Sequence, residues 1–391
     1  MKNAFILFKQ GFIKFSALLI IVFATSNIEA QEKNTDNIKI MESYGSFGVG
    51  HVFLDLIDID RKEMATKNPN DLREIPIQVW YPIAKGTQGK KSNYRPRVEA
   101  FRADWGDQSV DYIKQVQTSV IEHAKISSDK AFGVFLFSHG WGARSSSHTT
   151  FLSNLASKGY IVVGINHAYM GKVVLSNMQF TEPDDSQFKN QEEANKYYAD
   201  DVIFVINHLK QLNRNDPNGL FTNAVKLNNI IAGGHSSGFP AVSGAAVIDH
   251  RIKGLISFDS GVPKVVRRNG LEVPLLLFRA EKDSYTDLFF RGINVHPKGT
   301  IYNVDFFRVH RADFYDLVIS DTTHSSIYDG YIFAETEEER VLSLRNHKIV
   351  LNWTSEFLTV VFDGTPSQLL ENKKDEPFTK LRVINAFKNN P

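Results

Sequence analysis

The sequence predicts an α/β protein with one mostly parallel central sheet and helices on both faces. From residue 132 onward, short and nearly continuous apolar runs alternate with longer amphipathic stretches. Apolar runs of this kind are typical of parallel strands that are covered on both sides. A Gly-x-Ser-x-Gly pentapeptide at residues 234–238 follows one of these runs directly. Such a pentapeptide is found where a buried strand turns sharply into a helix.

The composition is that of an ordinary soluble globular protein. The 391 residues are 42% hydrophobic and 23% charged. They contain no internal repeat and no second core, so we expect a single domain over residues 31–391. The formal net charge of +1 argues against nucleic acid as a partner. The chain has no cysteine, which excludes a disulfide framework, a thiolate nucleophile and thiolate zinc sites.

Residues 1–30 have the order of a secretory signal peptide. Three lysines, Lys2, Lys9 and Lys14, precede an apolar run over residues 15–24, and Ala30 supplies a small residue at the expected cleavage site. We therefore expect an exported protein, periplasmic or secreted, with a polar leader over residues 31–40 and no integral membrane segment after cleavage. An uncleaved membrane anchor is the alternative, but the apolar run is short for a membrane span.

The first predicted elements are two strands, at residues 48–55 and 75–82, joined by a charged loop over residues 61–73. The second strand alternates apolar and polar residues in part, which predicts a half-exposed edge strand. Later strands are expected at residues 134–137, 161–165, 227–233, 255–258 and 274–278.

Helices are expected at residues 146–158, 199–212, 241–246 and 349–361. The second has an apolar stripe at helical spacing, which is typical of a helix that covers a sheet. Residues 314–319 are mostly apolar and fit either a strand or a short helix. The polar segment 179–195 interrupts the alternation of strands and helices, and we expect either a surface loop or a lid there.

The pentapeptide makes Ser236 the candidate nucleophile. The sharp turn lifts the serine hydroxyl out of the sheet, and the small residues on either side keep the neighbouring backbones from colliding. The N–H of Ser237 then lies at a helix N-terminus, where it can stabilise an oxyanion. A second donor is expected from the His-Gly loop that follows the strand at residues 134–137. By position, that donor is the N–H of Trp141.

A serine hydroxyl needs a base, and in this arrangement the histidine comes last in the chain. The histidines after residue 259 are His296, His310, His324 and His347. His324 is favoured because it lies in a polar loop of small residues directly after the apolar segment 314–319. We expect structural or solvated roles for the other three, since His347 precedes the closing helix, His310 lies inside a predicted strand and His296 lies in a loop.

Two aspartates are candidates for the acid that orients this histidine. Asp259 and Asp283 each follow a predicted strand, at the sheet edge where open α/β sheets carry their functional groups. The residues alone leave both open. No His-Glu-x-x-His motif and no compact group of metal ligands occurs in the sequence, so neither a metal nor a cofactor is expected.

Five segments resemble the plasma-type platelet-activating-factor acetylhydrolase family of α/β-hydrolases. They are residues 75–82, 137–143, 155–162, 234–238 and 249–259, within a resemblance that spans about residues 75–370. The resemblance implies an α/β-hydrolase fold and favours Asp259 over Asp283, because the family's acid follows the strand at 255–258. Phe239 and Pro240 depart from the family pattern, which usually has a second glycine after the pentapeptide. Chlorophyllases and bacterial polyester hydrolases share much of the pattern, so the resemblance implies the chemistry more closely than the substrate.

The sequence thus predicts an exported serine carboxylic-ester hydrolase, esterase- or lipase-like, with Ser236, His324 and Asp259 as its triad. Its partner would be a small-molecule or lipid ester, for instance a short-acyl or phospholipid ester. One alternative is an amidase or peptidase that uses the same site. Another is an inactive binding protein on a hydrolase scaffold, although the intact set of site residues argues against it.

Overall fold

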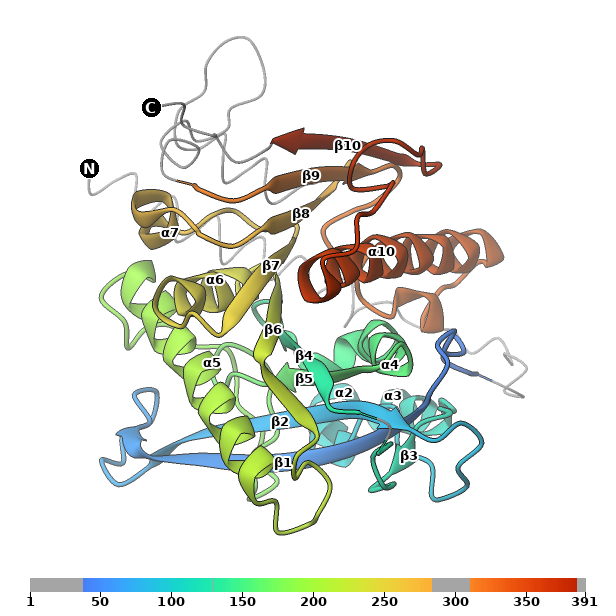
Figure 1. The fold of residues 1–391 in the computed structure, drawn as a ribbon. Coiled ribbons are helices and arrows are strands. Elements are labelled where there is room, and N and C mark those ends of the chain that lie inside the picture. The colour runs from blue at the N-terminus through green and yellow to red at the C-terminus, as the bar shows by residue number, and fades with distance from the viewer. Residues whose placement is uncertain (1–37, 129, 283–309, 385–391) are drawn as a thin grey trace.

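The computed structural model describes residues 38–128, 130–282 and 310–384 (Figure 1). The predicted signal peptide, Asp283 and His296 lie outside these residues. Only the last three residues of the predicted polar leader lie inside them.

A single twisted sheet forms the centre of the described structure. Its strand order is β10-β9-β8-β7-β6-β4-β5-β2-β1-β3. Neighbouring strands from β5 to β9 are parallel, whereas β2 is antiparallel to both β1 and β5, and β10 is antiparallel to β9. The strands are β1 (Gly48–Lys62), β2 (Leu72–Ile83), β3 (Ile121–Glu122), β4 (Phe132–Ser138), β5 (Tyr160–Ile165), β6 (Val225–His235), β7 (Ile252–Phe258), β8 (Leu275–Ala280), β9 (Phe314–Ile319) and β10 (Thr379–Ile384). The mostly parallel sheet predicted from the sequence is confirmed.

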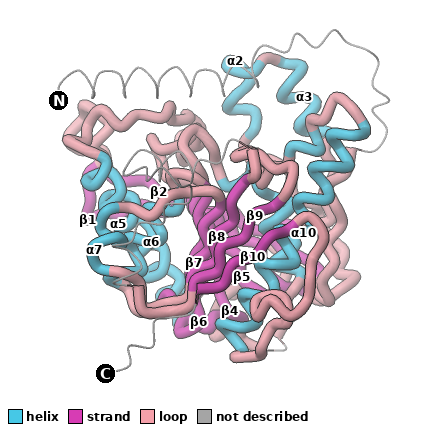
Figure 2. Tube along the Cα trace, turned by 90° about the horizontal axis from the view of Figure 1, so that it is seen from above, coloured by secondary structure: helices cyan, strands magenta, loops and turns pink. Residues whose placement is uncertain are grey.

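Helices cover both faces of this sheet, as Figure 2 shows from above. On one face lie α5 (Gln191–Arg214), α6 (Gly238–Ile248) and α7 (Lys264–Asn269). On the other lie α2 (Arg102–Trp105), α3 (Asp107–Gln115), α4 (Thr149–Ser157) and α10 (Glu337–Asp363). Short 3-10 helices are η1 (Val98–Phe101), η2 (Ser145–His148) and η3 (Gly330–Ile332). Among the residues described, no helix has the length and apolar character needed to cross a membrane.

The alternation of side chains along the central strands builds two cores. In β4, Val134 and Leu136 pack on the side of α5 and α6, while Phe135 and Phe137 pack on the side of α4 and α10. Successive residues of a strand face opposite sides of a sheet. A strand in this position must therefore be apolar on both faces, which explains the continuous apolar runs in the sequence.

The prediction that residues 75–82 form a half-exposed edge strand is wrong. Strand β2 lies inside the sheet between β1 and β5, and nearly all of it is buried. The partial alternation that suggested an exposed face comes from Gln78. This residue is buried and donates a hydrogen bond from its amide to Ser145 Oγ at 2.8 Å. A polar residue with an internal partner gives the same sequence pattern as a solvated one.

Three helices are longer than predicted, and one of them is α6, which runs over Gly238–Ile248 rather than residues 241–246. The closing helix α10 begins at Glu337 rather than at residue 349, so His347 lies inside it rather than before it. Its start is marked by a capping box in which Thr336 and Glu339 bond each other's backbone N–H. Helix α5 begins at Gln191, and Asn190 caps it by accepting from the N–H groups of Glu192 and Glu193.

The polar segment 179–195 is therefore partly helical. Its beginning pairs with residues 173–175, through hydrogen bonds from Thr181 N–H to the Val173 carbonyl and from Leu175 N–H to the Gln179 carbonyl, both at 2.8 Å. Its end forms the first turn of α5. The ambiguous segment 314–319 is the strand β9, and His310 precedes this strand rather than lying within one. Helices α2, α3 and α7 and strands β3 and β10 were not among the predicted elements.

Candidate active site

The pentapeptide forms the sharp turn between β6 and α6. Ser236 lies between the last residue of the strand and the first residue of the helix, with a φ of 51°. A left-handed backbone at a non-glycine residue costs on the order of 1–3 kcal/mol. The turn also needs its glycines, because a Cβ on Gly234 would collide with the backbone of Gly238 and Phe239. A Cβ on Gly238 would collide with the carbonyl oxygens of Ser138 and His139.

Phe239 and Pro240 fit the start of α6 without disturbing this turn. The Phe239 side chain is completely buried and belongs to the core beneath α5 and α6. Pro240 occupies the first turn of the helix, where its missing N–H has no acceptor to lose. The departure from the family pattern is therefore accommodated by the core of the protein.

Asp259 and His324 are brought together over the end of the sheet. Asp259 directly follows β7, and His324 lies in the loop after β9. Asp259 Oδ2 accepts a hydrogen bond from His324 Nδ1 at 2.7 Å. The exposed fractions of the two side chains are only 14% for the histidine and 8% for the aspartate. Because Nδ1 donates to the carboxylate, Nε2 is the ring nitrogen that can accept a proton.

Asp259 is itself held in an unusual backbone conformation, with a φ of 50°. Its N–H donates to the Phe278 carbonyl at 2.8 Å, and its Oδ1 accepts from the Ala280 N–H at 3.3 Å. Both contacts come from β8. Strand β8, after which the alternative acid Asp283 was expected, therefore helps to position the Asp259 carboxylate.

Ser236 and His324 are connected through the residue that precedes the serine. His235 donates a hydrogen bond from Nε2 to the His324 carbonyl at 2.9 Å, and the two rings are 4.6 Å apart. Burial, and then the neighbouring His324, lower the pKa of His235 to about 3, so it is a neutral hydrogen-bond donor. Within the described part of the chain, Ser236 Oγ makes no hydrogen bond to His324. Catalytic hydrogen bonds often tighten only when substrate binds.

The loop that carries Trp141 packs directly against the serine. A Cβ on Gly140 would lie 3.1 Å from Ser236 Cβ, so a larger residue there would force the serine or the loop to shift by a few tenths of an ångström. The loop is a tight turn in which Ala143 N–H donates to the Gly140 carbonyl and Gly142 N–H donates to the Met170 carbonyl. The N–H groups of Trp141 and Ser237 donate to no acceptor among the described residues. This arrangement is what an oxyanion site requires.

A buried neutral histidine sets the shape of this loop. His139 Nδ1 donates to the Gly140 carbonyl at 2.8 Å, and its Nε2 accepts from the His167 N–H at 3.1 Å. Burial, and then the neighbouring His167, lower the pKa of His139 to about 3. The ring therefore stays neutral at ordinary pH and keeps one donor and one acceptor nitrogen.

A second Ser–His–Asp series lies beneath this loop and was missed in the sequence. Ser138 Oγ lies 2.9 Å from His167 Nε2, and His167 Nδ1 lies 2.8 Å from Asp201 Oδ2. All three side chains are fully buried, so no substrate can reach Ser138. The series instead links the end of β4 to α5. No sequence motif connects these three positions, because they belong to separate elements.

Two arginines complete the buried network around Asp201. Arg73 donates to both carboxylate oxygens of Asp201, with its shortest contact at 2.6 Å, and Arg61 donates to Oδ1 at 2.7 Å. Burial by itself would raise the pKa of Asp201, but the charge of Arg73 and the hydrogen bonds from His167 and Arg73 outweigh it and hold that pKa well below its usual range. Burial lowers the pKa of His167 despite its acidic neighbour. The network therefore contains a charged aspartate and a neutral histidine.

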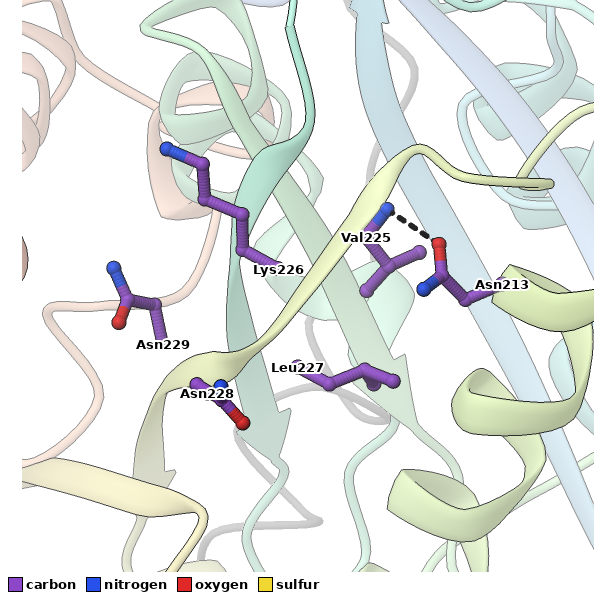
Figure 3. Close-up of a pocket in the computed structure, with 6 residues that line it drawn as sticks. All are labelled: Asn213, Val225, Lys226, Leu227, Asn228 and Asn229. Carbon is purple, nitrogen blue, oxygen red and sulfur yellow. Dashed lines mark hydrogen bonds between the residues drawn. The ribbon is translucent and has the colours of Figure 1, made fainter.

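A surface cavity lies far along β6 from the serine. Figure 3 shows its lining, which comes from Asn213 and residues 225–229. These residues are at the start of β6, and the serine follows the end of the same strand. None of the candidate site residues lines this cavity. The described residues also contain no group of three or more side chains that could hold a metal ion.

The comparisons with known proteins agree with this architecture. Residues 37–215 match the family described as "Platelet-activating factor acetylhydrolase, isoform II". Among solved structures, a ferulic acid esterase from Streptomyces cinnamoneus superposes with a TM-score of 0.69 at 20% identity, covering 88% of this chain and 98% of that chain. Comparison with curated proteins gave no match. The predicted resemblance and the α/β-hydrolase fold are confirmed.

The buried network predicts that Arg73→Met strongly destabilises the protein. The variant leaves the charge of Asp201 buried with Arg61 as its remaining cation, and removing one partner of a buried ion pair typically costs about 3–5 kcal/mol. Urea unfolding followed by circular dichroism measures the loss. Arg102→Met is the matched control, because Arg102 makes its ion pairs at the surface and such pairs contribute little. Equal stability of the two variants would contradict a structural role for the network.

Proposed function

We propose that this α/β-hydrolase-fold chain is an exported serine carboxylic-ester hydrolase. The single observation that carries the proposal is the hydrogen bond between Asp259 and His324, beside a serine held at the strand-to-helix turn. The family match over residues 37–215 supports an ester as substrate. A small-molecule or lipid ester fits this proposal, with short-acyl and phospholipid esters as the first candidates.

In the proposed reaction, Ser236 Oγ attacks the ester carbonyl carbon while His324 Nε2 takes the hydroxyl proton. The carbonyl π bond opens, and its oxygen becomes the oxyanion of a tetrahedral intermediate. When the intermediate collapses, the bond to the leaving oxygen breaks and His324 passes its proton to the leaving alcohol. A water molecule then repeats the sequence on the acyl-serine, which releases the acid and restores the serine.

Asp259 has two roles in this proposal. Its hydrogen bond from Nδ1 keeps the acceptor nitrogen of His324 available to the serine, and its negative charge stabilises the imidazolium that forms. The positive φ of Asp259 and its contacts with β8 support this assignment, because they aim the carboxylate at the loop after β9.

The N–H groups of Trp141 and Ser237 would stabilise the oxyanion. Donors that are already oriented before the reaction need no rearrangement when the charge develops, and each typically contributes about a hundredfold or more in turnover. The close packing of Gly140 on Ser236 and the hydrogen bonds of His139 support such a fixed arrangement.

Ser236→Ala should abolish ester hydrolysis and leave the fold intact. Loss of a nucleophilic serine typically costs about a millionfold in turnover. A panel of p-nitrophenyl esters from acetyl to palmitoyl, an oxidised phospholipid and an anilide measures activity and separates an esterase from an amidase. A fluorophosphonate probe should label the wild type only. Labelling that persists in the variant would exclude Ser236 as the nucleophile.

Asp259→Asn should lower turnover by about four orders of magnitude, because an amide favours the wrong tautomer of the histidine. Asp283→Asn is the comparison variant and should change the rate at most a few fold. Kinetics on one p-nitrophenyl ester, with circular dichroism to check folding, distinguish the two. The reverse ranking would assign the acid to the later position.

Export predicts a mature N-terminus near Gln31. Mass spectrometry of protein recovered from the periplasm or the medium should show the loss of about thirty residues. Full-length protein recovered from the inner membrane would instead support an uncleaved anchor.

A further inference from the structure

Two arginines, Arg144 and Arg95, lie near the candidate active site. Arg144 lies three residues after Trp141, and Arg95 lies shortly before η1. Neither forms a salt bridge within the described part of the chain. Three of their nitrogens are buried without a hydrogen-bond partner, namely Nε and Nη1 of Arg144 and Nε of Arg95. A buried donor without a partner is costly, and more so when it is charged.

Aromatic rings hold both guanidinium groups in place. The central carbon of the Arg144 guanidinium lies 4.5 Å from the Phe101 ring and 4.6 Å from the Trp105 ring, and these two rings are stacked on each other. The corresponding carbon of Arg95 lies 5.1 Å from the Phe333 ring. Aromatic faces attract a cation, but they accept none of the hydrogen bonds that the guanidinium N–H groups offer in their plane.

The carboxylates that interact electrostatically with these arginines, Asp104 with Arg144 and Asp329 with Arg95, are hydrogen-bonded to other groups. Asp104 accepts from Lys172 at 2.6 Å. Asp329 accepts from the Tyr94 hydroxyl at 2.9 Å and from the Thr150 N–H. Burial, and then the nearby positive charge of Arg95, lower the pKa of Arg144 to about 9. The two positive charges therefore repel each other, and an added anion would offset this repulsion.

The arginines are close to the residues that would carry out the reaction. Arg144 belongs to the same loop as Gly140, which packs on Ser236. Arg144 lies near enough to Tyr328 for its charge to act on the pKa of the Tyr328 hydroxyl, and the Tyr328 ring is 5.0 Å from the ring of His235. Arg144 is thus linked to Ser236 in two ways. Its own loop contains Gly140, which packs on the serine, and its neighbour Tyr328 packs on His235, the residue before the serine.

We infer that Arg144 and Arg95 form a subsite for an anionic group, a carboxylate or a phosphate, on the ester that Ser236 attacks. This inference rests on the proposed ester hydrolysis and specifies its substrate class. A guanidinium presents paired N–H donors that match the two oxygens of a carboxylate or a phosphate. Both arginines are only partly buried, and a bound anion would offset the repulsion between the two like charges.

Three pairs of esters test the inference, each with a charged and a neutral member. Mono-4-nitrophenyl glutarate and 4-nitrophenyl pentanoate compare a carboxylate on the acyl side. The pair of 4-acetoxybenzoate and its methyl ester tests the effect of a carboxylate on the alcohol side. Acetoxyphenyl phosphate, also as the 4-isomer, and phenyl acetate compare a phosphate there. We expect a charged-over-neutral ratio of kcat/KM of roughly tenfold or more in at least one pair, and the pair identifies the source of the anion.

In Arg144→Gln and Arg95→Gln that ratio should fall to near one, and Arg144→Lys should retain part of it because the charge remains while the paired donors are lost. Arg102→Gln is the matched control, since Arg102 lies on the same short helix α2 as Trp105 but is bound by surface carboxylates. It should leave the ratio unchanged. Ratios near one for all three pairs in the wild type, or a ratio that both glutamine variants retain, would overturn the inference.

A binding measurement separates this inference from the proposed reaction. Isothermal titration of the Ser236→Ala variant with phenyl phosphate and with benzoate should give weaker binding by roughly tenfold or more when Arg144→Gln is added. Failure of the wild type to hydrolyse any ester would overturn the proposed function, but the binding measurement would still test the anion subsite. Normal hydrolysis of neutral esters, with no anion binding to the Ser236→Ala variant, would overturn the subsite alone.

Discussion

Close backbone packing around Ser236 is the constraint on which the rest of the site depends. Three glycines make it possible. Gly234 and Gly238 approach neighbouring backbone more closely than a side chain would permit, and Gly140 leaves only a tight space beside the serine. The strained φ of Ser236 is stable only because β6 is fixed between β4 and β7 and α6 is fixed against α5. The turn, the loop before it and the sheet therefore form one rigid unit.

Buried polar groups extend this rigidity outward from the serine. His235 and His139 are both neutral because of burial, and their rings form hydrogen bonds that hold neighbouring loops. Below them, Asp201 and Arg73 tie α5 to the β1–β2 side of the sheet through a network that has almost no access to water. Such groups are costly to bury. In this protein they fix the loop that carries the proposed oxyanion donor.

The pattern of apolar residues accounted for most of the sheet, because parallel strands covered on both faces must be apolar throughout. The strands from β4 to β9 and the turn at Ser236 follow from that rule and from the pentapeptide. The prediction for β2 was wrong because Gln78 departs from that rule. It is polar but buried, with an internal hydrogen-bond partner. Helix lengths were underestimated where polar residues begin a helix on its solvent side, as in α5 and α10.

The sequence by itself determined the fold class, the turn at Ser236 and the candidate residues at strand ends, because each depends on neighbours in the chain. Only the tertiary structure decided which distant groups meet. It joined Asp259 to His324, placed His235 between the serine and the loop after β9, and assembled Asp201 with residues from four other segments. It also placed Arg144 and Arg95 on aromatic rings, with no salt bridge to either among the described residues. Contacts of this kind depend on how elements pack in space, and no local pattern of residues encodes them.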